Sequence, residues 1–372
     1  MKLSVERQPF LSELQLVTRA AATRSAIPAL GGVMLKAAGD SVGLAATDTE
    51  IALQSSLPAD VDQEGTLLLP ARLLLDIVRV ADGDRVTIEA ASDQGVVKVT
   101  SQRASFAVRT LPAGDFPKLP GADADTAVQL DAGALAATIE RVAKAASRDE
   151  TRPVLTGILV SLEGGTLRMV ATDSYRLSVK EAAVPGMNGS AFEANVPARA
   201  LQELGRVVAE THPEAVSIVT RDNQVVFESG RVTLSSRLID GQFPNYRQLL
   251  PESYEHDVVI DKSELLGVVR RVSLMAQRNA PLRLRFEQGT VTLSAQTPDV
   301  GEASESVPVN YQGDELEIGF NPQFLQDGLE SVGAEEVRLR LISALRPGLI
   351  EPAGGEEDDQ FLYLIMPVRL NV

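Results

Sequence analysis

Two carboxylates are the residues of this sequence best placed to do chemistry. Asp48 lies in VGLAATDTEI (42–51) and Asp173 in RMVATDSYRL (168–177), each directly after a threonine. Two carboxylates brought together could serve as general acid and base or hold a divalent cation. Each aspartate also follows a segment with strand character, where a carboxylate ordinarily caps a turn. We expect the turn-capping role, with a carboxylate hydrolase acting through Asp48 or Asp173 as an alternative.

Other catalytic groups are scarce. The chain has no cysteine, which excludes thiol nucleophiles, disulfides and thiolate metal sites. Its two histidines, His212 in THPE and His256 in YEHD, stand in polar, turn-like segments without metal-ligand spacing, so we expect both at the surface. The sequence contains no Walker loop, dinucleotide-binding glycine motif, nucleophile elbow or zinc-protease motif. It therefore predicts no catalytic residue, no metal site and no cofactor.

Composition restricts the class of protein further. Of the 372 residues, 44% are hydrophobic and 23% are charged, as in ordinary globular domains. No apolar run is long enough to cross a membrane, and the first residues lack the apolar core of a signal peptide. We expect a cytoplasmic protein without a membrane partner. The net charge of −16, taken alone, argues against a polyanionic partner.

A long internal repeat organises the chain. The step Thr47-Asp48 returns as Thr172-Asp173 after 125 residues. Two further landmarks, Pro70-Ala71-Arg72 and Phe116-Pro117, return after 127 residues as Pro197-Ala198-Arg199 and Phe243-Pro244. A fainter third copy begins near Asp261 and places Pro322 125 residues after Pro197. Three copies account for the whole chain, so the repeat predicts three domains, at 1–120, 128–251 and 252–372.

Each copy shows the same order of elements: an amphipathic helix, strands, a second helix and more strands. In the second copy, Leu135, Ile139 and Val142 fall on one helical stripe. A proline can start the second helix in every copy, and Asn321 suits the N-cap of the last one. Segments such as RVTIEA (85–90) alternate β-branched and polar residues, as antiparallel strands do. The sequence predicts an α+β fold in which two helices per domain are backed by antiparallel sheets.

Positive charge recurs on the predicted helices. The trio Arg72, Asp76 and Arg79 returns as Arg-Glu-Arg within 199–206, and its spacing keeps each trio on one helical face. If all helices lie on one side of a continuous sheet, their basic faces line one surface while acidic residues gather elsewhere. Such a surface would bind duplex nucleic acid without sequence preference. Only 4% of the residues are aromatic, which disfavours a single-strand binder.

Several motifs, in order and at matching separations, relate the sequence to a known family. They are MKLSVER (1–7), IPALGG (27–32), VATDSYRL (170–177), DGQFPNYRQLLP (240–251), IGFNPQFL (318–325) and MPVRL (366–370). With them the whole chain resembles the bacterial DNA polymerase III beta subunit, the replicative sliding clamp family. The resemblance implies a DNA-clamp fold with three repeated domains, and two subunits joined head to tail into a ring with the helices on the inside.

The resemblance also implies a function. A ring of this family encircles duplex DNA and tethers the replicative polymerase as a processivity factor; it is not an enzyme and has no 3'-5' exonuclease activity. The implied partners are duplex DNA, a second copy of the chain, the polymerase alpha subunit, the clamp loader, translesion polymerases and repair proteins. The alternative is a ring-shaped protein-interaction scaffold without DNA binding, in which local carboxylates neutralise the basic helix faces.

The family's binding residues map onto positions of this sequence. The implied DNA-binding residues, together with the recurring helix cations, are Arg24, Arg72, Arg79, Arg141, Lys144, Arg148, Arg152, Arg199, Arg206, Arg270 and Arg271. The implied dimer interface uses Phe106 and Val108 of one subunit and Leu274 and Met275 of the other. In the loop at 148–154, Asp149, Pro153 and Val154 replace the glutamine and tyrosines of some members, so contacts there are expected from Arg148 and Arg152.

The resemblance further implies a hydrophobic pocket that receives a short linear motif from partner proteins. Its positions are Leu155, Thr172, Ser174, Tyr175, Arg176, Leu177, Pro244, Gln248, Leu249, Asn321, Phe324, Leu345, Met366, Pro367, Val368, Arg369 and Leu370. Apolar side chains with a few polar groups suit an aromatic and an aliphatic anchor. Two positions depart from the family pattern: Gln248 stands where some members have arginine, and Asn279 where some have an aromatic residue.

Overall fold

The computed structural model describes residues 1–90, 95–121, 127–184, 192–277, 280–354 and 360–370. The chain divides into two compact units, each made of two stretches. Unit 1 comprises Met1–Gly133 and Glu203–Leu238, and unit 2 comprises Ala134–Gln202 and Ile239–Val372. Residue 279, at which the sequence departs from the family pattern, lies outside the described residues. The predicted boundaries of the three domains stay a prediction.

The described part of unit 1 forms two antiparallel sheets, with the strand orders β5-β1-β7-β8-β9 and β10-β15-β16-β17-β4-β3-β2-β6. The strands are β1 Lys2–Glu6, β2 Gly32–Ala38, β3 Ser41–Thr47, β4 Ile51–Pro58, β5 Asp60–Gln63, β6 Gly65–Pro70, β7 Arg85–Ala90, β8 Val96–Ser101, β9 Ala104–Arg109, β10 Val128–Asp131, β15 Ala215–Arg221, β16 Gln224–Ser229 and β17 Val232–Arg237.

The described part of unit 2 also forms two antiparallel sheets, ordered β14-β11-β12-β13-β25-β24-β23-β18 and β21-β20-β19-β22. The strands are β11 Gly157–Glu163, β12 Thr166–Thr172, β13 Arg176–Ala183, β14 Phe192–Pro197, β18 His256–Asp261, β19 Leu282–Glu287, β20 Thr290–Thr297, β21 Gly301–Pro308, β22 Leu316–Phe320, β23 Glu336–Leu341, β24 Gly348–Ala353 and β25 Phe361–Ile365.

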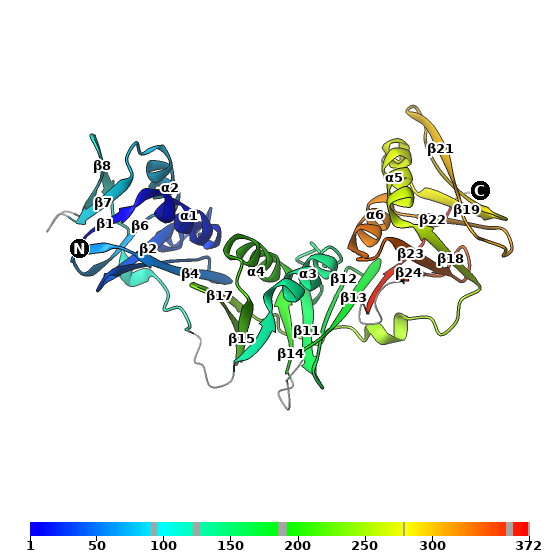
Figure 1. Cartoon of the computed structure of the whole chain (residues 1–372), viewed down its shortest axis with the longest axis horizontal. Coiled ribbons are helices and arrows are strands. Elements are labelled where there is room, and N and C mark those ends of the chain that lie inside the picture. Colours follow the sequence, from blue (N-terminus) through cyan, green and yellow to red (C-terminus); the bar gives the residue numbers. More distant parts are fainter. Residues whose placement is uncertain (91–94, 122–126, 185–191, 278–279, 355–359, 371–372) are drawn as a thin grey trace. The chain divides into compact units, whose positions relative to one another are not determined.

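The α-helices of the described chain are amphipathic and cover the sheets: α1 Arg7–Val17, α2 Ala71–Val80, α3 Ala132–Ala143, α4 Ala198–Thr211, α5 Lys262–Val272 and α6 Pro322–Ser331. Helix α2 buries Leu74, Ile77 and Val78 and leaves its polar residues in solvent. Full burial of one such side chain stabilises the fold by about 1.5–3 kcal/mol. In unit 1, α1 packs beside α2 and on β3 and β4, and in unit 2, α5 packs beside α6 (Figure 1). The predicted α+β class is confirmed.

Both eight-stranded sheets are joints between successive repeats. In the first joint, β4 pairs with β17, and in the second joint, β13 pairs with β25. Strand β13 begins 125 residues after β4, as the repeat requires, and β21 begins 125 residues after β13. Strand β9 is likewise the first-copy equivalent of β17, and it lies at the edge of its sheet, as β21 does. Strands β9 and β21 therefore lack the second neighbour that their equivalents β17, β4 and β13 have.

The Thr-Asp steps build the same turn in both joints. The Thr47 hydroxyl donates to the Ile51 carbonyl over 2.7 Å, and the Asp48 carboxylate accepts from the backbone N–H of Glu50 and Ile51. Thr49, which lies between Asp48 and Glu50, has a φ of +80°. Residues 172–176 repeat these contacts and this φ, with Ser174 in the left-handed position. The expected turn-capping role of both aspartates is confirmed.

Capping also explains the start of α6. The Asn321 side chain accepts from the backbone N–H of Gln323 at 3.0 Å and Phe324 at 3.2 Å, and Pro322 is the first helical residue. The predicted N-cap is confirmed, so Asn321 has a structural task at the edge of the expected peptide pocket. In α2 and α4 the corresponding prolines, Pro70 and Pro197, stand one residue before the helix.

One of the two histidines is not at the surface, contrary to the prediction from its polar neighbours. His256 is the first residue of β18 and is buried against Tyr311. The Tyr311 hydroxyl donates to the carbonyl of Asp314, so it accepts from the His256 Nδ1–H at 2.5 Å. The YEHD segment enters a strand whose alternate side chains point inward, and no turn occurs there. His212 is exposed, as expected.

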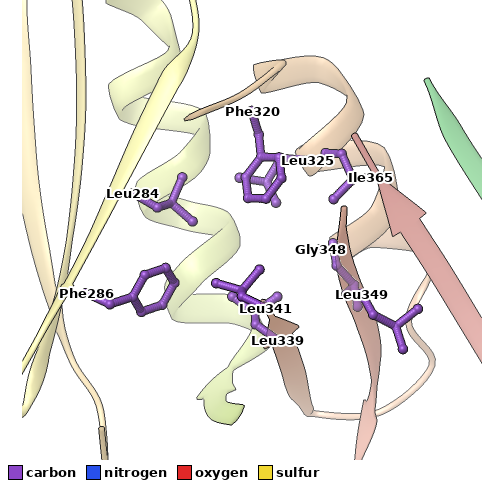
Figure 2. A pocket seen from close by; sticks show the side chains of 10 residues that line it. Leu284, Phe286, Phe320, Leu325, Leu339, Leu341, Gly348, Leu349 and Ile365 are labelled. Atoms are coloured by element: carbon purple, nitrogen blue, oxygen red, sulfur yellow. The ribbon is translucent and has the colours of Figure 1, made fainter. Parts of the chain in front are cut away.

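The core of unit 2 contains a small void between β19, α6 and the strands β23 to β25 (Figure 2). Its lining is wholly apolar and includes Phe286, Phe320, Leu341 and Ile365. The free volume is about 10 Å³, the space of a single water molecule. An apolar void of this size stays dry and holds no ligand, so it belongs to the packing of the unit.

Candidate nucleic-acid and partner-peptide sites

Two of the predicted DNA-binding trios contain internal ion pairs. On α2, Arg79 contacts Asp76 at 3.1 Å, and on α4, Arg206 contacts Glu203 at 3.0 Å. Arg72 is exposed and makes no ion pair with the described residues. The repeated spacing therefore produces one paired arginine per helix as well as a basic face.

The first joint carries an ion-pair cluster between the end of α1 and α4. Arg19 contacts the nearly buried Glu203 at 2.5 Å and binds Glu210 with two hydrogen bonds, at 2.6 and 2.9 Å. Burial alone would lower the pKa of Arg19, but the hydrogen bonds and charges of these two glutamates raise it. Arg19 thus stays charged and fastens two repeats together inside unit 1.

The second joint has a matching cluster in unit 2. Lys144, directly after α3, and Arg270 of α5 both contact Glu330 of α6 at 2.9 Å. Partial burial would raise the pKa of Glu330, but hydrogen bonds from Arg270, Gln326 and Lys144 lower it to about 2. Neighbouring Arg271 binds Glu305 on β21 through two hydrogen bonds, at 2.9 and 2.6 Å. Three of the predicted DNA-binding cations are therefore already paired with carboxylates: Lys144 and Arg270 with Glu330, and Arg271 with Glu305.

The loop at 148–154 separates its two arginines by environment. Arg148 is exposed and makes no ion pair with the described residues. Arg152 instead binds Asp149 at 2.9 Å and donates to the Ser174 hydroxyl at 3.1 Å. Hydrogen bonds from Thr151 and Arg152 hold the pKa of Asp149 below its usual value. Arg148 is the cation of this loop that is available to a new anion.

The remaining predicted DNA-binding residues lie in both units. Arg24 is exposed in unit 1, in the segment between α1 and β2, without an ion pair among the described residues. Arg199 is exposed in the first turn of α4. The guanidinium of Arg141 lies close against Gly333 at the end of α6, so it also contributes to the second joint. In Figure 1, α1 and α2 lie on one side of the eight-stranded sheet of unit 1. Helices α3 and α6 lie on one side of the eight-stranded sheet of unit 2.

Four residues of the expected peptide pocket are large exposed hydrophobic residues of unit 2. Large hydrophobic residues are exposed at few described positions, and four of these are positions predicted for the pocket: Tyr175 (62%), Leu249 (51%), Leu345 (63%) and Met366 (40%). They come from the residue before β13, the short helix Tyr246–Leu249, the turn before β24 and the residue after β25. Exposed apolar patches commonly mark interaction sites, so these four residues are candidates for contact with a partner.

A buried hydrophobic cluster contains residues close in the chain to these four positions. Its buried members include Leu177, Phe243, Tyr246, Leu349 and Leu364. The predicted pocket residues Leu155 and Thr172 are buried, whereas Pro244 and Gln248 are exposed. The residues predicted for the pocket therefore divide into exposed and buried ones.

A buried polar network completes the floor of the pocket region. Arg176 contacts Asp173 at 3.0 Å, Asp327, and the Tyr363 hydroxyl at 3.3 Å, and its guanidinium lies over the Phe324 ring, 4.3 Å from the centroid. The Tyr363 hydroxyl donates to the Phe324 carbonyl at 2.9 Å, and burial raises the pKa of Tyr363. Arg176 and Phe324 thus hold α6 against β13 and β25.

The carboxyl-terminal segment closes one side of this region. Its backbone continues the sheet pairing, since the Met366 N–H donates to the Tyr175 carbonyl at 2.8 Å. Farther on, the Val368 N–H donates to the Gly319 carbonyl at 2.8 Å, and the Leu370 side chain packs close to Gly319. Pro367 and Arg369 lie between these anchors. The segment is therefore fixed to two strands, which places the exposed Met366 beside Tyr175.

The expected dimer-interface residues differ in exposure. Leu274, just after α5, is 69% exposed, whereas Met275 is partly buried and its carbonyl accepts from the Thr297 hydroxyl at 2.6 Å. On β9, Phe106 is partly exposed but Val108 is already buried within unit 1.

The sequence analysis missed two exposed apolar residues of α2, Leu73 and Val80. Helix α2 has more apolar residues than one buried face needs, and this excess could have revealed them.

No described residues bring three histidine, aspartate or glutamate side chains together in a way that could hold a metal ion. Within the same residues, no helix is both long and apolar enough to cross a membrane.

Comparisons with known proteins match the whole chain. Family models of the N-terminal, central and C-terminal domains of the DNA polymerase III beta subunit match residues 1–120, 129–245 and 247–369 of this chain. A beta sliding clamp from Synechocystis is 36% identical, and one from Streptomyces coelicolor is 33% identical; each match covers 100% of both chains.

Solved structures agree with these matches. The sliding clamp of Bacillus subtilis has a TM-score of 0.94 at 29% identity, and the DNA polymerase III beta subunit of Pseudomonas aeruginosa has 0.91 at 31%; both cover 100% of each chain. A further Pseudomonas aeruginosa clamp structure contains bound griselimycin. The chain therefore belongs to the DNA polymerase III beta subunit family of bacterial sliding clamps and has the three-domain clamp fold.

Proposed function

We propose that two copies of this chain close into a ring around duplex DNA and tether a replicative DNA polymerase in the cytoplasm. Each copy contributes three domains, at 1–120, 128–251 and 252–372. The protein acts as a processivity factor and performs no chemistry of its own. The observation that carries the ring is the pair of edge strands, β9 and β21, left by two complete joints.

The edge strands β9 and β21 can pair with each other in the same way as the strands that form the two joints. Each joint pairs an equivalent of β21 with an equivalent of β9, namely β4 with β17 and β13 with β25. Pairing β21 of one copy with β9 of a second copy repeats this contact between subunits. Two such pairings related by a twofold axis close the assembly and leave neither edge exposed.

The register of the subunit joint follows from the other two. Ile51 pairs with Ser236 in the first joint, and Arg176 pairs with Ile365 in the second. The equivalent pair between subunits is Gly301 with Val108, which sets Ser304 opposite Ser105. Since Val108 is buried in its own unit, this strand offers its backbone and Phe106 to the partner.

A disulfide between subunits tests this register. The double variant Ser105→Cys and Ser304→Cys is expected to form a covalent dimer on mild oxidation, because residues directly opposite in antiparallel strands lie within disulfide reach. Both serines are exposed, and the natural chain has no cysteine. Non-reducing electrophoresis measures the yield. The control Ser105→Cys with Ser306→Cys is displaced along the strand and should crosslink poorly; equal yields from both variants would contradict the register.

The helix side of the joints shows a parallel substitution. Arg19, Lys144 and Leu274 each stand two residues after a buried valine at the end of the first helix of their copy. At the two joints within the chain the cation contacts a glutamate of the following repeat. In the third copy the residue is an exposed leucine, which suits the exposed Leu73 and Val80 on α2 of the second subunit.

Duplex DNA is the proposed occupant of the ring. Exposed Arg24, Arg72 and Arg148 are the strongest phosphate-binding candidates, since they make no ion pair with the described residues. The paired cations can also contribute, because a surface ion pair contributes only about 0–1 kcal/mol and a phosphate can replace the carboxylate. The other predicted cations complete the proposed surface: Arg79, Arg141, Lys144, Arg152, Arg199, Arg206, Arg270 and Arg271.

The salt dependence of DNA binding tests these residues. Replacing Arg24, Arg72 and Arg148 by alanine is expected to reduce the slope of log K against log salt by about 0.9 for each phosphate that the variant no longer neutralises. Fluorescence anisotropy with a labelled duplex measures this slope. The control Arg285→Ala removes an exposed arginine of β19 that pairs with Glu315. A slope unchanged in the triple variant would exclude these residues from the DNA surface.

Topology tests the function itself. A labelled clamp loaded by its clamp loader onto a nicked circular plasmid is expected to stay bound in high salt and to leave once the circle is cut. Gel filtration separates plasmid-bound from free clamp. Retention on the linear DNA would contradict encirclement.

The ion pairs favour one alternative, the ring-shaped interaction scaffold without DNA binding. Carboxylates accompany Arg19, Arg79, Lys144, Arg206, Arg270 and Arg271. A scaffold would load onto neither circular nor linear DNA, so the plasmid experiment separates the two functions. The hydrolase alternative is not proposed, because both aspartates serve their turns.

The proposed partners bind through the exposed apolar group in unit 2. Polymerase alpha subunit, clamp loader, translesion polymerases and repair proteins would each insert a short linear motif between Tyr175, Leu249, Leu345 and Met366. One aromatic and one aliphatic anchor suit this surface. The buried Arg176 network keeps its floor rigid, which limits the entropy lost on binding.

A further inference from the structure

The first joint contains a cavity of about 190 Å³ in unit 1. Its walls are the turn between β3 and β4, the first residues of β4, the last residues of β17, Gln224 of β16 and the segment 117–120. The Gln54 side chain donates to the Pro120 carbonyl at 3.1 Å and so holds that segment against β4. The cavity is thus an open hollow, bordered by stretches of chain that hydrogen bonds and sheet pairing fix in place.

This cavity occupies the place in the first joint that the exposed apolar group occupies in the second. The Arg237 N–H donates to the Glu50 carbonyl at 3.0 Å, and the Met366 N–H donates to the Tyr175 carbonyl at 2.8 Å. The two contacts are equivalent by the repeat, so Glu50 corresponds to Tyr175 and Arg237 to Met366. The segment 117–120 begins at the proline that corresponds to Pro244.

The two joints share this backbone frame but differ in chemistry. In the second joint the frame carries Tyr175, Leu177, Leu364 and Met366; in the first it carries Glu50, Ala52, Ser235 and Arg237. Alanine and serine are much smaller than leucine, which opens the volume. Glutamate and arginine replace the apolar side chains at its mouth, so a hydrophobic anchor no longer fits.

The charge of the cavity selects an anion. Lys118 and Arg237 both line it, both are exposed, and neither forms an ion pair with the described residues. Glu50 is the acidic residue of the lining, and Thr49 and Ser235 add hydroxyl groups. Two cations with neighbouring hydroxyls bind a carboxylate through charge-assisted hydrogen bonds, and arginine does so with two parallel bonds.

We propose that the first joint is a second peptide-binding site, which takes a short acidic segment of a partner protein with its carboxylates on Arg237 and Lys118. The volume suits one or two side chains, and the shared frame favours a peptide over a free ion. The site lies in a different pair of repeats from the apolar group, so one subunit could hold two different partners at once. This inference does not require DNA binding.

The test uses the full-length protein with methyl-labelled isoleucine, alanine and methionine. The probes are the capped tripeptides acetyl-Glu-Glu-Ala-amide and acetyl-Gln-Gln-Ala-amide, together with inorganic phosphate. The acidic peptide is expected to shift the Ile51 and Ala52 methyl signals saturably and to leave the Met366 signal unmoved, while the glutamine peptide shifts none. The double variant Lys118→Gln and Arg237→Gln should weaken binding at least tenfold. The control Lys36→Gln removes an exposed cation of β2 and should bind as the natural chain does.

Three results would overturn the proposal. They are the absence of saturable shifts at Ile51 and Ala52, equal shifts with the acidic and the glutamine peptide, and tighter binding of phosphate than of the acidic peptide. The last would make the cavity a phosphate site. None of these results bears on loading onto circular DNA, so the proposal and the clamp function can fail separately.

Discussion

Replacing Leu274 by aspartate is expected to convert the dimer into monomers and to abolish loading onto circular DNA. Leu274 is 69% exposed in the single chain, so the substitution leaves the fold of the subunit unchanged. In the proposed ring the side chain is buried against α2 of the second subunit. Burial of a leucine contributes about 1.5–3 kcal/mol, and an unpaired buried carboxylate adds a further penalty.

The twofold symmetry doubles this effect. Each dimer contains the substituted contact twice, so the dissociation constant is expected to rise by roughly a thousandfold or more. Sedimentation velocity at micromolar protein should show a species of 39.7 kDa in place of the dimer. Circular dichroism should match that of the natural chain.

Ile27→Asp provides the matched control for this prediction. Ile27 is also an exposed large apolar residue, but it lies away from β9, β21 and the end of α5 in the sequence. The control should remain dimeric and load normally. A Leu274→Asp variant that dimerises as tightly as the natural chain would contradict the proposed joint.

The second large effect is expected at the apolar group of unit 2. Replacing Leu345 and Met366 by alanine should remove most of the stimulation of the polymerase alpha subunit in primer extension on a long template. Two anchoring contacts of about 1–2 kcal/mol each lower partner affinity roughly a hundredfold. Both residues are exposed, so the free energy of unfolding should change little.

Dimerisation separates this effect from a general defect. The double variant should stay dimeric and load onto DNA when the loader is in large excess, because neither residue belongs to the edge strands. Ile27→Ala again serves as the control and should stimulate the polymerase fully. Normal stimulation by the double variant would remove Leu345 and Met366 from the partner site.

The sequence predicted those features of the fold that depend on the internal repeat or on residues close together in the chain. The 125-residue offset located the equivalent strands, and the turn at Asp48 and the cap at Asn321 use contacts within four residues. Ion pairs between repeats were not predictable in this way. Arg19 lies 191 residues from Glu210, and only folding brings them together.

Burial accounts for the other differences between sequence and structure. His256 looks exposed in a polar segment because the pattern of one strand does not show what packs on it; Tyr311, from another segment, covers it. Val108 and Arg176 match family positions by type, yet their own units already bury them. The exposed pocket members, in contrast, are apolar residues in turns and strand ends, where no core position requires them.

The ion pairs at the two joints within the chain have a consequence for how the ring opens. Arg19 and Lys144 reinforce those joints with charge, whereas the proposed subunit joint would have the exposed Leu274 at the same position. Salt screens charge contacts, while apolar contacts weaken on cooling. We therefore expect the ring to open for DNA at the subunit joint. This joint should weaken on cooling and should tolerate salt better than the two joints within the chain.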